Sequence, residues 1–126
     1  MTKTRTSIQI GQQAEDEACN YLQKQGYSLL ERNYRCKMGE IDLIMKDNTC
    51  IVFVEVRLRN NPRCGNALDS VDLRKQKKLT LTATHYLCQK KWFDKVNCRF
   101  DVIGISYSQM KASLQWIKNA FSAYHF

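Results

Sequence analysis

The chain has 126 residues, 44% of them hydrophobic and 25% charged, which is enough for one core and too little for two independently stable domains. Because no apolar run reaches the roughly 18 residues that span a bilayer, and no signal-type segment follows the N-terminus, we expect a single cytoplasmic domain over residues 1–126. The formal charge of +8 excludes little, but it favours a polyanionic partner, nucleic acid first.

The N-terminal part predicts a helix followed by an edge strand. Apolar residues recur at helical spacing from Ile8 to Gln25, and Gly26 follows as a stop. The segment from Tyr27 to Tyr34 fits a short strand, and Cys36 to Gly39 fits a turn. The apolar positions of the helix are Ala14, Ala18, Tyr21 and Leu22.

The middle of the chain predicts a β-hairpin. Glu40 to Lys46 and Ile51 to Leu58 are rich in β-forming residues, and the turn-favouring Asp47-Asn48-Thr49 joins them. Both runs carry apolar residues at successive positions, so helices should cover the hairpin on both faces. We therefore expect it at the centre of a sheet.

A second helix is expected after a long loop. Arg59 to Asp69 is long enough for a functional loop, and Ser70 is a candidate N-cap of the helix. Its first turns are crowded with cations. The apolar stripe is Leu79, Ala83, Tyr86 and Leu87, and the cations are Arg74, Lys75, Lys77 and Lys78.

The C-terminal part predicts two strands. Arg99 to Tyr107 reads as a core strand, and Leu114 to Ile117 as a short edge strand. The six cysteines show no CxxC spacing and lie at no ligand distance from either histidine, so we expect reduced thiols and no structural zinc site. His85 is expected to be a surface or packing residue of the second helix.

Two carboxylates and an arginine form the candidate site. Glu55 interrupts a buried apolar strand, where a carboxylate costs several kcal/mol unless it is paired, protonated or bound to a cation. The strand alternation lets Asp42, Glu55 and Arg57 project to one face, and paired carboxylates suit Mg²⁺ or Mn²⁺. A structural ion-pair network explains the same residues equally well.

Four ordered segments resemble the bacterial YraN family of uncharacterised proteins, and the resemblance covers nearly the whole chain. The segments are Gly39-Glu40-Ile41-Asp42-Leu43-Ile44, Val52-Phe53-Val54-Glu55-Val56-Arg57, Lys75 to Leu79, and Arg99-Phe100-Asp101-Val102-Ile103. That family is similar to the PD-(D/E)xK nuclease superfamily, particularly the archaeal Holliday junction resolvases. The resemblance implies an α/β restriction-endonuclease-like core of order αβββαβ, with a central mixed sheet flanked by helices.

The resemblance also implies roles for the acids. Asp42 and Glu55 would be ligands of Mg²⁺ or Mn²⁺, Glu40 an auxiliary carboxylate, and Glu15 a further ligand or a group that positions water. Arg57 stands where the nuclease signature has a lysine. Because arginine stays protonated, Arg57 can stabilise negative charge but cannot act as a base. Lys75 or Lys78 of the second helix could supply the missing lysine, although a Lys-rich helical turn is more often a solvated face.

The expected nucleic-acid contacts are made to phosphates. Arg57, Arg59 and Arg63 could line a groove that grips the backbone without reading bases, and Arg74, Lys75 and Lys78 could add contacts. Trp92, Phe93 and Tyr107 could stack on unpaired bases, but such aromatics more often pack in the core. Branched or otherwise structured DNA is the expected partner, and a homodimer would suit the symmetry of branched DNA.

Three functions fit these patterns. The first is a metal-dependent endodeoxyribonuclease of resolvase type. The second is a catalytically weak or inactive nucleic-acid-binding module on the same fold, which Arg57 favours. The third is an interaction protein in which the site residues form a structural ion-pair network.

Overall fold

The structure, a computed structural model, describes residues 6–59, 65–109 and 111–123. Its elements form one mixed sheet with strand order β1-β2-β3-β4-β5, in which β3 and β4 are parallel and the other neighbours antiparallel. The elements are α1 (Ser7–Lys24), β1 (Ser28–Cys36), β2 (Gly39–Asp47), β3 (Cys50–Leu58), the 3₁₀ helix η1 (Ala67–Ser70), α2 (Leu73–Gln89), β4 (Asn97–Ser108) and β5 (Lys111–Phe121).

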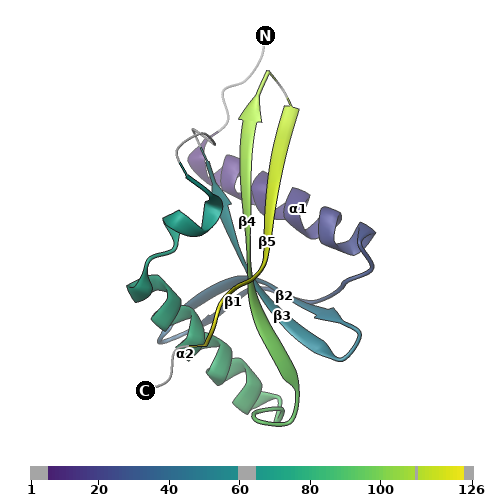
Figure 1. The fold of residues 1–126 in the computed structure, drawn as a ribbon, viewed down its shortest axis with the longest axis vertical. Helices are drawn as coiled ribbons and strands as arrows, with labels where there is room; N and C mark the ends of the chain where they lie inside the picture. The colour runs from purple at the N-terminus through teal and green to yellow at the C-terminus, as the bar shows by residue number, and fades with distance from the viewer. Residues whose placement is uncertain (1–5, 60–64, 110, 124–126) are drawn as a thin grey trace.

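Each face of the sheet is covered by one helix. On one face Ala14, Ala18 and Leu22 of α1 pack on apolar residues of β2, β3 and β4. On the other face Leu79 and Tyr86 of α2 join a second apolar cluster. Figure 1 shows the two helices apart from each other, flanking strands that fan out strongly, as expected for the twist of an open sheet. The predicted αβββαβ order and the mixed sheet flanked by helices are confirmed.

The helices lie close to their predicted positions, with one correction at the start of α2. Thr6 caps α1 in a capping box with Gln9, and Gly26 follows the helix with a φ of +96° that favours glycine. The prediction that Ser70 caps α2 is wrong, because Asp72 occupies the cap and accepts a hydrogen bond from the Lys75 amide at 2.8 Å. Ser70 instead ends η1.

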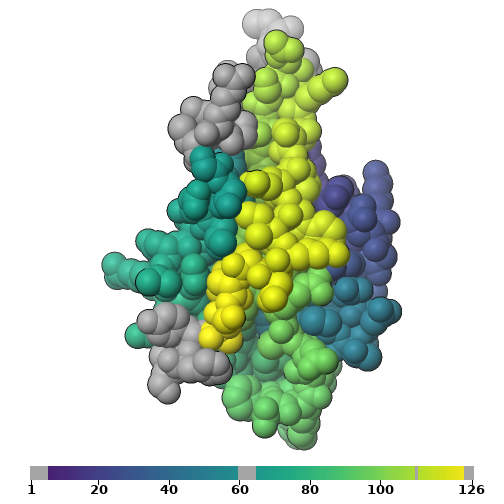
Figure 2. Space-filling view, viewed as in Figure 1, coloured from purple at the N-terminus to yellow at the C-terminus, as the bar shows by residue number. Residues whose placement is uncertain are grey.

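The predicted hairpin is confirmed, and the two outer strands are longer than predicted. β2 and β3 lie next to each other, with β3 at the centre of the sheet. β5 is the predicted edge strand, but it pairs with β4 from Phe121 to Lys111. Most of its side chains are exposed or half-buried, so the hydrophobic pattern reveals only its middle. Figure 2 shows β5, in yellow, running along the surface of the molecule.

None of the helices in the described ranges is both long and apolar enough to cross a membrane. Five cysteines in those ranges are free thiols, and Cys64 lies outside the described residues.

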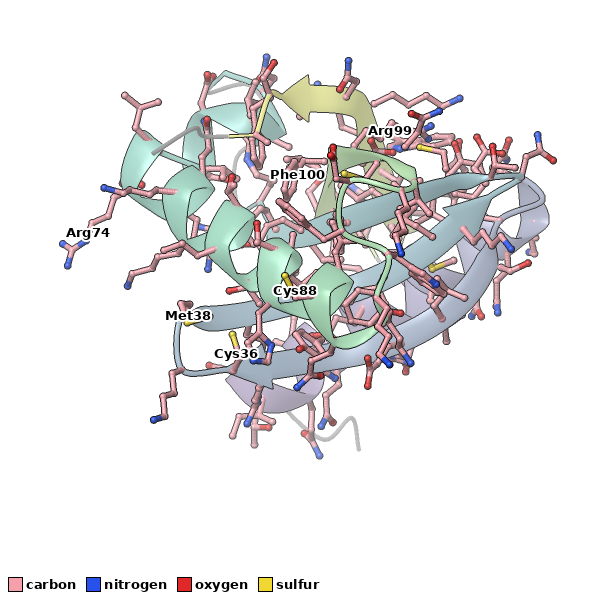
Figure 3. All side chains as sticks on the ribbon, turned by 90° about the horizontal axis from the view of Figure 1, so that it is seen from below. Cys36, Met38, Arg74, Cys88, Arg99 and Phe100 are labelled. Carbon is pink, nitrogen blue, oxygen red and sulfur yellow. The ribbon has the colours of Figure 1, made fainter. Side chains whose placement is uncertain are left out.

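A buried carboxylate joins β4 to β5 on the face covered by α1. Asp101 is fully buried, and its oxygens accept hydrogen bonds from Arg99 Nε at 3.0 Å, Trp116 Nε1 at 3.0 Å and the Asn119 amide at 2.9 Å. Arg99, labelled in Figure 3, also donates to Tyr27 and pairs with Asp47 at 3.5 Å. These hydrogen bonds hold the edge strand β5 to β4, and they explain why an acidic residue lies within the buried part of β4.

Replacing Asp101 by alanine is expected to lower the free energy of unfolding by about 3–5 kcal/mol, because it leaves Arg99 and the Trp116 N–H without their buried partner. Urea denaturation measures the loss. Asp47→Ala is the matched control, since it removes the other carboxylate paired with Arg99 but at a partly exposed site, where we expect less than about 1 kcal/mol. Equal losses in the two variants would show that burial of Asp101 is not what matters.

Candidate active site

Two carboxylates meet where the pairing of β2 and β3 ends. Asp42 and Glu55 lie directly beyond the last paired residues, Leu43 and Val54, and their carboxyl groups share a hydrogen bond. Glu55 is only 4% exposed, and Asp42 Oδ2 accepts a hydrogen bond from the Val56 amide at 2.8 Å. The predicted convergence of Asp42 and Glu55 is therefore present in the structure.

The proximity of the two carboxyl groups changes the chemistry of Asp42. Burial, followed by the charge of Glu55 and a hydrogen bond shared with it, raises the pKa of Asp42 from 3.8 to about 8. The Val56 amide opposes this shift only in part. Near neutral pH the carboxyl pair therefore holds a proton.

Two cations contact the same oxygen of Glu55. Lys75 Nζ of α2 lies 3.2 Å from Glu55 Oε2, and Arg57 Nη1 lies 3.7 Å from it. Lys75 and Lys78 were the candidates to replace the lysine of the nuclease signature. Of these two, Lys75 is the one that the structure brings to the carboxyl pair. No cation of the described residues pairs with Asp42.

The position of Arg57 is fixed by η1, a contact that the sequence did not reveal. Arg57 Nε donates to Ser70 Oγ at 3.1 Å, and Ser70 Oγ donates to the Ala67 carbonyl at 2.7 Å. η1 can lie this close because β4 has Gly104 beneath it: a Cβ there would lie 2.6 Å from the Ala67 Cβ. Gln115 of β5 accepts a hydrogen bond from the Ala67 amide at 2.8 Å. Side chains distant in sequence therefore hold the arginine in the site.

The other two predicted acids lie beside the carboxyl pair but have their own partners. Glu15 pairs with Arg32 at 3.4 Å, and burial followed by the charge of Asp42 raises its pKa. Glu40 pairs with Arg35 at 3.4 Å and is partly exposed. The charge of Glu40 contributes to the raised pKa of Asp42, and the roles of Glu15 and Glu40 as ligand or auxiliary group remain predictions.

A pocket of about 440 Å³ opens beside Lys75 and Arg57. Three of the residues that line this pocket belong to α2 and were predicted to contact phosphates. Two others were not assigned to the site from the sequence. Arg59 donates instead to the Gly65 carbonyl at 3.2 Å, and Arg63 lies outside the described residues. The lining residues are Arg57, Ser70, Asp72, Arg74, Lys75 and Lys78.

The aromatic residues considered for base stacking lie elsewhere. Trp92 packs against the core cluster beyond the C-terminal end of α2, and Phe93 beside it is 53% exposed. Tyr107 donates to Glu17 at 2.9 Å on the α1 side. His85 bonds to the Tyr34 hydroxyl, which agrees with its expected packing role.

The carboxyl pair fits a divalent cation with few protein ligands. No group of three or more His, Cys, Asp or Glu side chains in the described ranges is arranged to hold a metal ion. Mg²⁺, however, is commonly held by one or two carboxylates, with water and substrate phosphate completing its shell. The raised pKa of Asp42 supports this fit, because a cation would replace the proton that relieves the repulsion between the carboxylates.

Comparison with known proteins places the chain in one family. The model of the uncharacterised protein family UPF0102 matches residues 14–105. UPF0102 proteins of Pseudomonas putida KT2440 and Pseudomonas aeruginosa PAO1 are 48% and 44% identical over 122 and 125 residues, covering 96% and 98% of this chain and 98% and 100% of theirs. One from Nitrosococcus oceani is 44% identical over 119 residues, 94% of this chain and 96% of its own. The chain therefore belongs to the uncharacterised family UPF0102, the YraN family of the sequence resemblance.

Proposed function

We propose that this protein is a metal-dependent endonuclease of Holliday-junction-resolvase type that hydrolyses a phosphodiester bond in structured DNA. The observation that carries the proposal is the meeting of Asp42, Glu55 and Lys75. The lysine ammonium lies 3.2 Å from Glu55, although it comes from α2 and not from the position two residues after the acid. The pocket of cations beside them supplies a place for a phosphate backbone.

The residues have distinct tasks in this proposal. Asp42 and Glu55 would hold Mg²⁺ or Mn²⁺, which polarises the phosphate and activates water. Lys75, whose Nζ lies 3.2 Å from Glu55 Oε2, can orient the attacking water. Arg57 stays protonated, so its donors stabilise the negative charge that develops on the phosphoryl oxygens.

The second candidate is a nucleic-acid-binding module with weak or no catalysis. Two observations favour it: Arg57 occupies the position of the signature lysine, and the described residues hold no three-ligand metal cluster. Such a module would keep the cationic pocket and its salt-sensitive affinity without turnover.

Cleavage of labelled DNA distinguishes the two candidates. Purified protein is incubated with four-way-junction, flap, single-stranded and duplex DNA in Mg²⁺ or Mn²⁺, beside an Asp42→Asn, Glu55→Gln double variant. We expect metal-dependent products from at least one branched substrate and none from the variant, because the cation has lost both carboxylates. Salt-sensitive binding without products in either protein would reject the nuclease and support the binding module.

A further inference from the structure

The pocket beside the carboxyl pair has more positive charge than its own acids neutralise. Arg74 and Lys78 line it and are exposed, and neither pairs with a carboxylate among the described residues. Figure 3 shows the Arg74 guanidinium extending away from α2. Asp72 is the one acid in the lining, and its carboxylate is bound to the Lys75 amide as the helix cap. These unpaired cations indicate an anionic ligand.

The charge is distributed unevenly around the carboxyl pair. The α2 side has the four cations of the pocket. The α1 side has Glu15 and Asp16, which share Arg32 as their partner, and the Asp16 side chain is 58% exposed. A polyanionic strand is therefore attracted to the α2 side of the site and repelled from the α1 side.

The pocket lacks the aromatic side chains on which unpaired bases stack. Its six lining residues include no aromatic ring, and base recognition on single strands relies on such rings for stacking. Trp92 and Phe93 lie past the far end of α2, and the helix from Lys75 to Gln89 alone is about 20 Å long at the standard rise per residue. The polar groups of the pocket are cations and a hydroxyl, which suit phosphate oxygens.

We propose that this pocket is a phosphate subsite that holds the DNA strand on the α2 side of the reacting phosphodiester, through backbone phosphates alone. Ser70 contributes by holding Arg57 at the inner wall, while Arg74 and Lys78 bind the phosphate from the rim. The proposal rests on the proposed function for the identity of the strand, but binding through the pocket does not require cleavage.

The test is a binding measurement in EDTA by fluorescence anisotropy. The probes are a labelled single-stranded oligodeoxynucleotide, an abasic strand of equal length that keeps all phosphates, and a methylphosphonate strand that keeps the bases but lacks backbone charge. The proteins are the parent, an Arg74→Ala, Lys78→Ala double variant, and Lys95→Ala. Lys95 is an exposed lysine beyond the far end of α2 and serves as the matched control.

We expect the abasic strand to bind within about twofold of the ordinary strand, and the methylphosphonate strand to bind more than about tenfold more weakly. The double variant should lose roughly tenfold in affinity at low salt, with a salt slope reduced by about 1.4, whereas Lys95→Ala should change little. Tenfold weaker binding of the abasic strand, or equal losses in the double variant and Lys95→Ala, would overturn the proposal. Absence of cleavage would reject the nuclease without affecting any of these outcomes.

Discussion

Replacing Lys75 by methionine is expected to reduce the rate of metal-dependent DNA cleavage by about 10²–10⁴-fold, the usual contribution of a positioned acid or base. Methionine keeps most of the side-chain volume and removes the ammonium that lies 3.2 Å from Glu55. Single-turnover cleavage of the preferred substrate measures the effect. DNA affinity should fall by less than about tenfold, since three other cations still line the pocket, so the loss should lie in the chemical step.

The control for Lys75 is a lysine moved to position 57. An Arg57→Lys, Lys75→Met double variant again has one amine beside Glu55, now from β3 itself, because position 57 also contacts Glu55 Oε2. If Lys75 supplies an amine to the carboxyl pair, the double variant should recover at least about tenfold of the lost rate. Unchanged cleavage in Lys75→Met would contradict the assignment of Lys75, and lack of recovery would limit the role to the α2 position.

The central elements were predictable because their side chains carry a strong pattern. β2 and β3 are apolar at successive positions, and both faces of the hairpin are covered in the structure. β5 was predicted only in its middle, since an edge strand that exposes most of its side chains has little hydrophobic periodicity. The sequence could not decide between Ser70 and Asp72 as the cap of α2, because serine and aspartate are both good caps. The structure decides it, since the Ser70 hydroxyl is bound to Arg57 and Asp72 caps the helix.

The carboxyl pair was predictable from its place in one hairpin, but its surroundings were not. Asp42 and Glu55 lie on neighbouring strands, directly beyond the paired residues Leu43 and Val54, so the hairpin itself brings them close together. The sequence offers two candidate lysines in one helical turn. Which of them reaches Glu55 depends on how α2 crosses the sheet, and the structure shows that it is Lys75. The docking of η1 through Gly104 and Gln115 joins segments of β4 and β5 that no local pattern connects.

The raised pKa of Asp42 predicts that the protein without metal loses stability as the pH rises toward 8. The carboxyl group has a pKa of 3.8 when unfolded and about 8 when folded, so between these values the folded state binds the additional proton. The free energy of unfolding therefore falls with rising pH in this window, by up to about 1.4 kcal/mol per pH unit from this group. Asp42→Asn removes the titrating group and should remove this contribution.

Urea denaturation of the parent and of Asp42→Asn at pH 6 and pH 8, in EDTA, measures the effect. The advantage of the asparagine variant is expected to grow between the two pH values by up to about 3 kcal/mol, because only the parent must release a proton into the repulsion of Glu55. Mn²⁺ should stabilise the parent more at pH 8 than at pH 6, since it competes with that proton, and should have little effect on the variant, which also loses cleavage. Parallel pH profiles of the two proteins in EDTA would show that Asp42 is ionised throughout this range, and the carboxyl pair would then need a cation from the protein itself to account for its stability.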